Sequence, residues 1–260
     1  MTAPSPPAPA ATALVPAPGR SSYPSMVLAQ TRTEVLLTLR RGESLLLTLA
    51  IPLGVLAFFT TVPVLPASAG RPVDFLVPGV LALAVTSTAF TGQAIATGFE
   101  RSYGVLKRLG STPLPRWGLL AGKTLAVVAV ELLQLALLVA LGLALGWSPH
   151  GSLPPVVLLV IVGTAACSGL GLLMAGTLRP ELTLAAANGL YLVFLLLGNI
   201  AFALSGALAG IGRALPTGAL AHGLRSVLRD GAGLPAADLG ILLAWSVVGL
   251  GAAAFTFRWE

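Results

Sequence analysis

Long apolar stretches separated by short polar segments dominate the chain. Six of them are about 20 residues long or longer, the length that an α-helix needs to cross the hydrocarbon core of a bilayer. The pattern therefore predicts an all-α integral membrane protein with six transmembrane helices. The predicted spans are residues 45–65, 77–99, 118–146, 153–178, 182–204 and 238–257.

The segment before the first span has a different pattern. Residues 26–44 place most of their apolar side chains on one side of a helix, with charged residues such as Arg32 and Glu34 interspersed. This pattern predicts an N-terminal amphipathic helix that either lies in the membrane interface or packs on protein beside it. Residues 1–25 are rich in Pro and Ala, and we expect a disordered tail with some polyproline II structure. The chain thus divides into this tail and a membrane domain of residues 26–260.

The composition supports a lipid environment. The chain is 56% hydrophobic and 9% charged, with a mean hydropathy of +0.92, whereas soluble domains carry about 25% charged residues. The formal net charge is +6, but the basic residues are dispersed and there are only three Tyr, so we expect no nucleic-acid binding. Cys167 is the single cysteine, which excludes an intrachain disulfide and a cysteine-based metal site.

The distribution of Lys and Arg predicts the orientation in the membrane. Cytoplasmic loops are enriched in these residues, and a cytoplasmic N-terminus places 11 of the 15 cations on the inner side. Both termini are then cytoplasmic, as an even number of spans requires. The inner set is Arg20, Arg32, Arg40, Arg41, Arg101, Lys107, Arg108, Arg116, Lys123, Arg179 and Arg258, and the outer set is Arg71, Arg213, Arg225 and Arg229.

Motifs of catalysis are scarce. The stretch "GLLAGKT" has three residues between Gly118 and Gly122, whereas a phosphate-binding loop has four, and no buried strand precedes it. We therefore expect no ATP binding by that route. His150 and His222 both fall on the predicted outer side without metal-ligand spacing. The chain is not expected to be an enzyme or to hold a metal or other cofactor.

Glu131 is the one acid deep inside a predicted span. It lies about 12 Å along the helix axis from Lys123 and about 80° around it, so a direct pair is not expected. Such a residue usually faces a bundle interior or a cavity. It is either a polar contact on a substrate path or at a subunit interface, or a locally satisfied structural residue. Asn188 and Asn199, in the predicted fifth span, are candidates for hydrogen bonds between helices.

The segment between the second and third spans carries a resemblance to a known family. With six spans and an amphipathic helix before them, the loop "FERSYGVLKRLGSTPLPRWGLLAGK" (residues 99–123) resembles that of ABC-2-type permeases, the membrane subunits of ATP-driven exporters. A second segment, residues 215–231, resembles the outer-face segment of this family, in which short re-entrant helices precede the last span. The loop residues that match are Glu100, Arg101, Gly104, Leu106, Lys107, Arg108, Thr112, Pro113, Leu114, Gly122 and Lys123.

In residues 215–231, Pro216 is suited to a helix start. The apolar face of this predicted helix consists of Leu220, Leu224, Val227 and Leu228.

The resemblance implies a mechanism. Residues 99–116 would form a coupling helix in a cleft of a separate ATPase subunit, which would hold ATP and Mg²⁺, and two permease chains would pair with two such subunits. Positive-inside topology alone also accounts for the cations of this loop. The coupling residues implied are Glu100, Arg101, Gly104, Lys107, Arg108, Pro113 and Lys123. The candidates for the path through the membrane are Thr86, Ser87, Thr88, Gln93, Glu131, Asn188 and Asn199.

The chain looks most similar to the antibiotic- and multidrug-resistance exporter permeases of actinobacteria, which implies the bacterial plasma membrane and contact with membrane lipids. Export of lipids or polysaccharides is the alternative within the family. A membrane scaffold without transport is the alternative outside it. A homodimer and a heterodimer both remain open.

Overall fold

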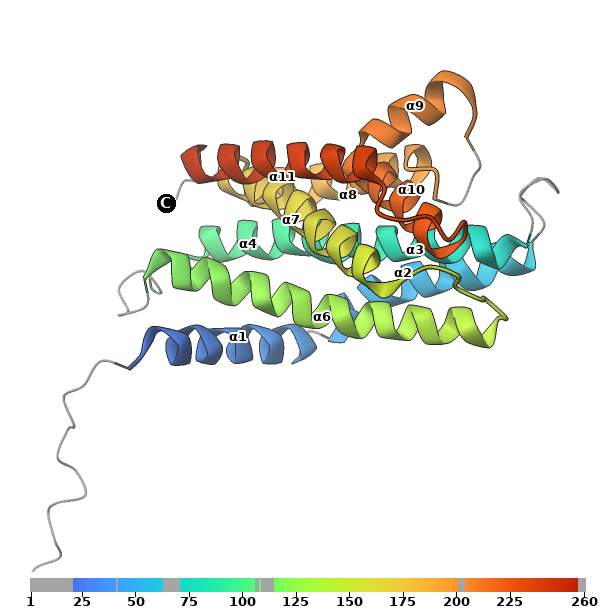
Figure 1. Cartoon of the computed structure of the whole chain (residues 1–260). Helices are drawn as coiled ribbons and strands as arrows, with labels where there is room; N and C mark the ends of the chain where they lie inside the picture. The colour runs from blue at the N-terminus through green and yellow to red at the C-terminus, as the bar shows by residue number, and fades with distance from the viewer. Residues whose placement is uncertain are drawn as a thin grey trace, which may run out of the picture.

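The computed structural model describes residues 21–40, 42–62, 71–105, 108, 115–200 and 204–256. Within these residues every regular element is a helix, which confirms the predicted all-α class (Figure 1). The helices are α1 (Tyr23–Arg40), α2 (Gly42–Thr61), α3 (Pro72–Val85), the π-helix η3 (Thr86–Gly92), α4 (Gln93–Ser102), α6 (Arg116–Ala144), α7 (Leu153–Thr177), α8 (Pro180–Leu197), α9 (Gly206–Ala214), α10 (Pro216–Leu228) and α11 (Ala236–Thr256).

Five helices in the described part of the chain are long and apolar enough to cross a membrane. They correspond to five of the six predicted spans. The apolar part of α2 that the structure describes, Leu49–Thr61, is shorter, so the span predicted at 45–65 stays a prediction. The five helices are Pro72–Ser102, Ala121–Ala144, Leu153–Thr177, Pro180–Leu197 and Ala236–Thr256.

A helix, α1, lies where one was predicted at residues 26–44, but it runs from Tyr23 to Arg40, so the tail predicted at 1–25 is wrong for residues 23–25. The amphipathic interfacial character of α1 stays a prediction. Residues 1–20 of the predicted tail lie outside the described residues. α1 has no fully buried residue and packs along the first half of α6 (Figure 1). α1 thus packs on protein, and its position in the membrane interface stays a prediction.

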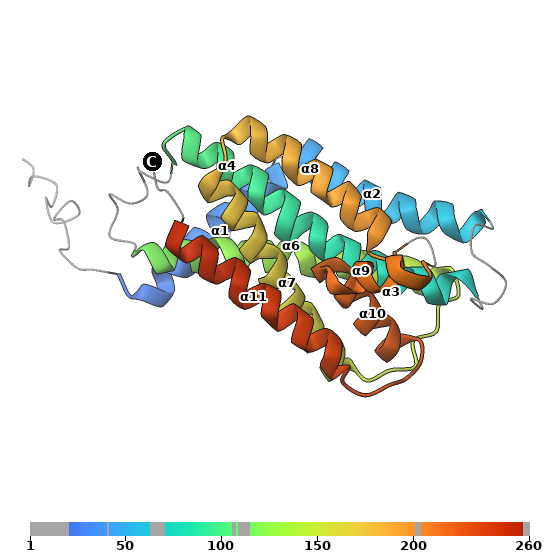
Figure 2. The same ribbon diagram turned by 90° about the horizontal axis from the view of Figure 1, so that it is seen from above.

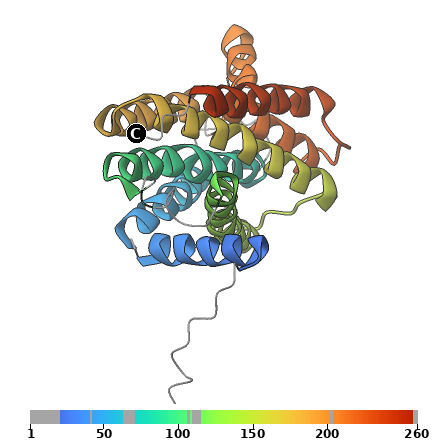
Figure 3. The same cartoon turned by 90° about the vertical axis from the view of Figure 1, so that its left-hand side faces the viewer.

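One continuous helix occupies the centre of the bundle. α3, η3 and α4 follow one another without a break, and this 31-residue segment is almost wholly buried in its most apolar window. Figures 2 and 3 show α2, α6, α7 and α8 around it. A helix that is apolar on all sides belongs in a core. The predicted second span is thus the axis on which the other helices pack.

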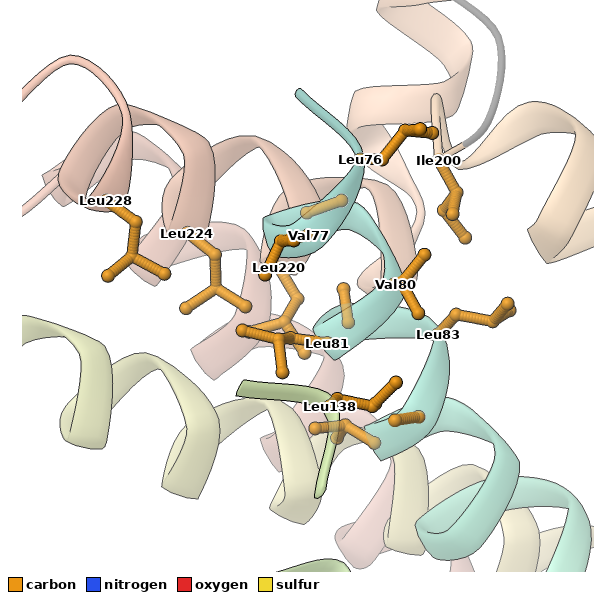
Figure 4. Close-up of a cluster of buried hydrophobic side chains, with 14 of the residues drawn as sticks. Leu76, Val77, Val80, Leu81, Leu83, Leu138, Ile200, Leu220, Leu224 and Leu228 are labelled. Atoms are coloured by element: carbon orange, nitrogen blue, oxygen red, sulfur yellow. The ribbon is translucent and has the colours of Figure 1, made fainter. Parts of the chain in front are cut away.

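The bundle has two ends, which we name by the chain connections found there. At the α4–α6 end lie the end of α4, the start of α6 and the α7–α8 connection; at the α6–α7 end lie the α6–α7 and α10–α11 connections (Figure 2). α10 begins at Pro216 as predicted, and its predicted apolar face is buried against α3 near the α6–α7 end (Figure 4). The labelled side chains of this core are Leu76, Val77, Val80, Leu81, Leu83, Leu138, Ile200, Leu220, Leu224 and Leu228.

The predicted extent of the fifth span, 182–204, is wrong at its C-terminal end, because α8 ends at Leu197. Asn199 lies in the following turn with a φ of 54°, a left-handed conformation that Asn tolerates better than most residues. Its Oδ1 accepts a hydrogen bond from the Leu204 backbone N–H at 2.9 Å. Asn199 therefore closes a turn instead of standing inside a span.

Candidate functional site

A buried lysine joins three helices at the α4–α6 end. Lys123 Nζ donates to Glu34 Oε1 of α1 at 2.8 Å and to Glu100 Oε2 of α4. The lysine side chain is 7% exposed, so its charge needs these partners. Gln30, one turn before Glu34, adds a hydrogen bond to the same carboxylate oxygen at 2.8 Å. We call Glu34, Glu100 and Lys123 the charge cluster.

The C-terminal end of α4 is fixed by further contacts. Arg101 donates from Nη2 to the carbonyl of Leu178, in the α7–α8 connection. α4 then ends at a left-handed glycine, Gly104, whose φ is +66° and whose N–H binds the Arg101 carbonyl at 3.1 Å. The end of α4 is therefore tied to α1, α6 and the α7–α8 connection at once.

The structure thus brings four of the predicted coupling residues, Glu100, Arg101, Gly104 and Lys123, to one end of the bundle. Arg108 is also described, and its N–H donates to the Gly104 carbonyl at 3.1 Å. Lys107 and Pro113 lie outside the described residues. Glu100 and Arg101 were expected to face another subunit, whereas the bonds described here lie within the chain.

Sequence reasoning missed Glu34 as a member of this cluster. Its carboxylate belongs to a helix 89 positions away from Lys123 along the chain. The signal available in the sequence was an acid on a predicted amphipathic helix whose other charged residues are mostly basic. This signal does not identify the residue that the acid binds.

Several predicted path residues form a polar layer within the bundle. Thr86 Oγ1 lies 2.9 Å from Thr217 Oγ1 of α10, and Thr88 donates to Gln134 Oε1 of α6 at 2.6 Å. The Glu131 carboxyl of α6 lies 2.7 Å from Thr164 Oγ1 of α7. These contacts link η3 to α6 and α10, and α6 to α7.

Three other path residues have different positions. Gln93 is buried, and its amide has no hydrogen-bond partner among the described residues. Ser87, on η3, is buried as well. Asn188 is exposed and donates to the Leu184 carbonyl of its own helix at 2.8 Å, so the hydrogen bond between helices predicted for it is not observed.

Two of the contacts in the polar layer, those of Thr86 and Thr88, start from η3. π-Helical turns are rare and occur often at functional sites. η3 was not predictable from the residues, because Thr and Ser fit α-helical and π-helical turns alike. Thr164, Gln134 and Thr217 were missed as partners because a single uncharged polar residue carries no sign of which helix it contacts.

Asp238 organises a second ionic cluster near the α6–α7 end. Its buried carboxylate accepts hydrogen bonds from Arg213 Nε of α9 at 2.8 Å and Nη2 at 3.2 Å, and lies 2.9 Å from His222 Nδ1 of α10. The hydrogen bond to Asp238 raises the pKa of Arg213. Trp245 of α11 donates to the Ala214 carbonyl at 2.8 Å. These bonds hold α9 and α10 to the start of α11.

Arg225 is a buried cation on the same side of the bundle. Nε donates to the Phe75 carbonyl at 2.9 Å and Nη2 to the Ile200 carbonyl at 3.0 Å, and the guanidinium lies 3.8 Å from the centre of the Phe75 ring. Burial lowers the pKa of Arg225 to about 9, so the group is charged at neutral pH. It can fit there because Gly79 has no side chain: a Cβ would lie 2.5 Å from Nη2.

The chemistry of these clusters is structural and electrostatic. The described residues contain no group of three His, Cys, Asp or Glu side chains that could hold a metal ion. The five described helices that are long and apolar enough to cross a membrane indicate a multi-pass membrane protein.

A family model described as "ABC-2 family transporter protein" matches residues 45–255. No curated protein matches the chain. Because the match spans most of the chain, the protein belongs to the ABC-2 family of transporter proteins. It is an ABC transporter permease, a membrane subunit of a kind that has no ATPase of its own.

Proposed function

We propose that the chain is the permease of an exporter that moves drugs or other amphiphilic compounds outward, using ATP that a separate subunit hydrolyses. That subunit would hold ATP and Mg²⁺, and a second permease chain would complete the membrane part. The observation that carries this proposal is the charge cluster, in which Lys123 binds Glu34 and Glu100.

The charge cluster lies where force from an ATPase would enter the membrane domain. The segment that resembles a coupling helix starts at the end of α4. Glu100 and Arg101 fix that end to α6 and to the α7–α8 connection, and Lys123 extends the link to α1. A movement imposed on residues 99–116 would therefore be shared by α1 and α6. Packed interiors transmit such displacements because they have low compressibility.

The central helix gives this movement a route to the interior. α4 continues without a break into η3, where Thr86 and Thr88 bind α10 and α6. A displacement of α4 along its axis would reach these hydrogen bonds directly. A layer of hydroxyl and amide groups within apolar helices suits a cargo that is itself amphiphilic.

The orientation proposed places the α4–α6 end in the cytoplasm of a bacterial plasma membrane. Eleven of the 15 Lys and Arg residues, including those near the two termini, then lie on the cytoplasmic side. The segment of α9 and α10, with the Asp238 cluster, would lie at the outer face. Cargo would be released between these outer elements.

Transport by inside-out membrane vesicles tests the proposal. Vesicles from the native cell and from a strain that lacks this chain are supplied with ATP and a panel of fluorescent amphiphilic dyes. ATP-dependent accumulation of at least one dye in the first vesicles and not in the second is expected. Equal accumulation of every dye in both would contradict export of such compounds and favour another cargo or a scaffold.

A further inference from the structure

Glu131 lies in the middle of α6, at the depth where a charged group is most expensive to place in a membrane. Its side chain is 2% exposed. Among the described residues no Lys, Arg or His side chain lies within ion-pair distance of its carboxyl group. Nothing in that part of the chain compensates a negative charge here.

The hydrogen bonds of Thr164 reveal how the carboxyl group is satisfied. Thr164 Oγ1 lies 2.8 Å from the Val160 carbonyl oxygen and 2.7 Å from Glu131 Oε1. A hydroxyl group has one hydrogen to donate and two lone pairs to accept with. The Thr164 hydroxyl can therefore donate its hydrogen to Glu131, or donate it to the Val160 carbonyl and accept a second hydrogen from Glu131.

Both short contacts of Thr164 Oγ1 are hydrogen bonds at once only in the second arrangement, in which the hydrogen between the two side chains comes from the glutamate. A carboxylate has no hydrogen to donate, whereas a neutral carboxylic acid has one. The pair of short distances at Thr164 Oγ1 is therefore satisfied completely only by an acid with its proton on Oε1. In that form Oε2 is a neutral carbonyl oxygen, and it has no hydrogen-bond partner among the described residues.

The groups around Glu131 are consistent with a neutral acid. From α7, the ionisable side chain that interacts with it is Cys167. η3 and the described side chains of α2 carry no ionisable group, and α3 carries Asp74 only, in its first turn at the α6–α7 end. From α1 the acid facing α6 is Glu34, which is bound to Lys123 eight positions before Glu131.

We propose that Glu131 is a proton-binding site of the membrane interior, with the proton held between Glu131 Oε1 and Thr164 Oγ1. The proton binds where Glu131 of α6 meets Thr164 of α7, and it links the two helices at this depth. A conformation that separates them, or that admits water between them, would release it to solvent and leave a carboxylate. This site is independent of the proposed export function, because it requires neither a cargo nor an ATPase.

Infrared spectroscopy of the purified full-length chain in lipid nanodiscs tests this directly. The carbonyl stretch of a protonated carboxylic acid lies above the amide bands, and exposed acids do not contribute there at neutral pH. Spectra are recorded for the unaltered protein, for Glu131→Gln and for Glu181→Gln. Glu181 is the matched control, because it is a glutamate in the first turn of α8 and is exposed.

We expect the acid band in the unaltered protein and in Glu181→Gln at neutral pH, and its loss in Glu131→Gln. A Thr164→Val variant keeps the acid but removes its acceptor, so its band should move to higher frequency. The absence of the band from the unaltered protein overturns the proposal without any variant. A band that persists unchanged in Glu131→Gln overturns it as well.

Discussion

Lys123 and Glu34 are 89 positions apart in the sequence, and their Nζ and Oε1 atoms lie 2.8 Å apart in the contact between α6 and α1. The same ammonium group binds Glu100 at the end of the central helix. A single buried cation therefore joins the amphipathic helix before the spans, the start of a span and the segment that resembles a coupling helix.

Removal of this cation should destabilise the protein strongly. Lys123→Met leaves two carboxylates facing each other with little solvent, and breaking a buried ion pair from one side costs about 3 kcal/mol in the free energy of unfolding. The loss is measured by denaturant unfolding in mild detergent. Arg179→Gln removes an exposed cation at the same end and should change stability by less than about 0.5 kcal/mol. Equal effects of the two substitutions would show that Lys123 does not hold these helices together.

The proposed coupling predicts a separate effect at Glu100. Glu100→Gln keeps the shape of the side chain but weakens its bond to Lys123, so the end of α4 should follow the ATPase less closely. We expect the protein to insert normally, with a fall of several-fold in ATP-dependent transport by vesicles. Glu181→Gln, at the same end of the bundle, should transport normally. An unaltered rate in Glu100→Gln would remove this residue from the coupling path.

Gly79 should tolerate no side chain. In Gly79→Ala the added Cβ would lie 2.5 Å from Arg225 Nη2 and 2.9 Å from the Ile200 carbonyl oxygen. Overpacking of this kind costs about 1–3 kcal/mol, which thermal unfolding in nanodiscs would detect. Gly189→Ala, in α8, adds a Cβ with no atom within 4 Å and should not destabilise. A stable Gly79→Ala variant would mean that Arg225 does not occupy this position.

The Asp238 cluster should be needed to hold α9 and α10. Asp238→Asn puts an amide N–H₂ group or an uncharged oxygen against Arg213 and His222, and we expect a loss of about 2 kcal/mol in the free energy of unfolding. Limited proteolysis within residues 204–235 should accelerate in the same variant. Asp230→Asn changes an exposed acid nearby and serves as the control. Identical cleavage of the two variants would count against this role.

The spans were predictable because bilayer thickness sets their length. The fourth was predicted at 153–178 and is observed at Leu153–Thr177. The end of α8 was not predictable from hydropathy, because residues 198–204 are nearly as apolar as the helix before them. The turn there depends on Gly198 and on the left-handed conformation of Asn199.

The site was predictable in part. The residues that match the family's loop pattern include Glu100 and Lys123, and the structure pairs these two directly. Their third partner, Glu34, could not be found, because contacts between helices depend on packing that sequence periodicity does not specify. The buried position of Arg225 was missed for a related reason: the order of the spans places it on the outer side but does not specify what it packs against.

The most direct test of the central claim is to identify what is bound to this chain in its native membrane. The tagged protein is purified in mild detergent, and the proteins that come with it are identified and quantified. The account predicts a separate ATPase subunit at about one copy per permease chain, with its recovery reduced by Glu100→Ala and unchanged by Glu181→Ala. Recovery of the chain alone, even after crosslinking with ATP trapped, would contradict the proposed role of residues 99–116.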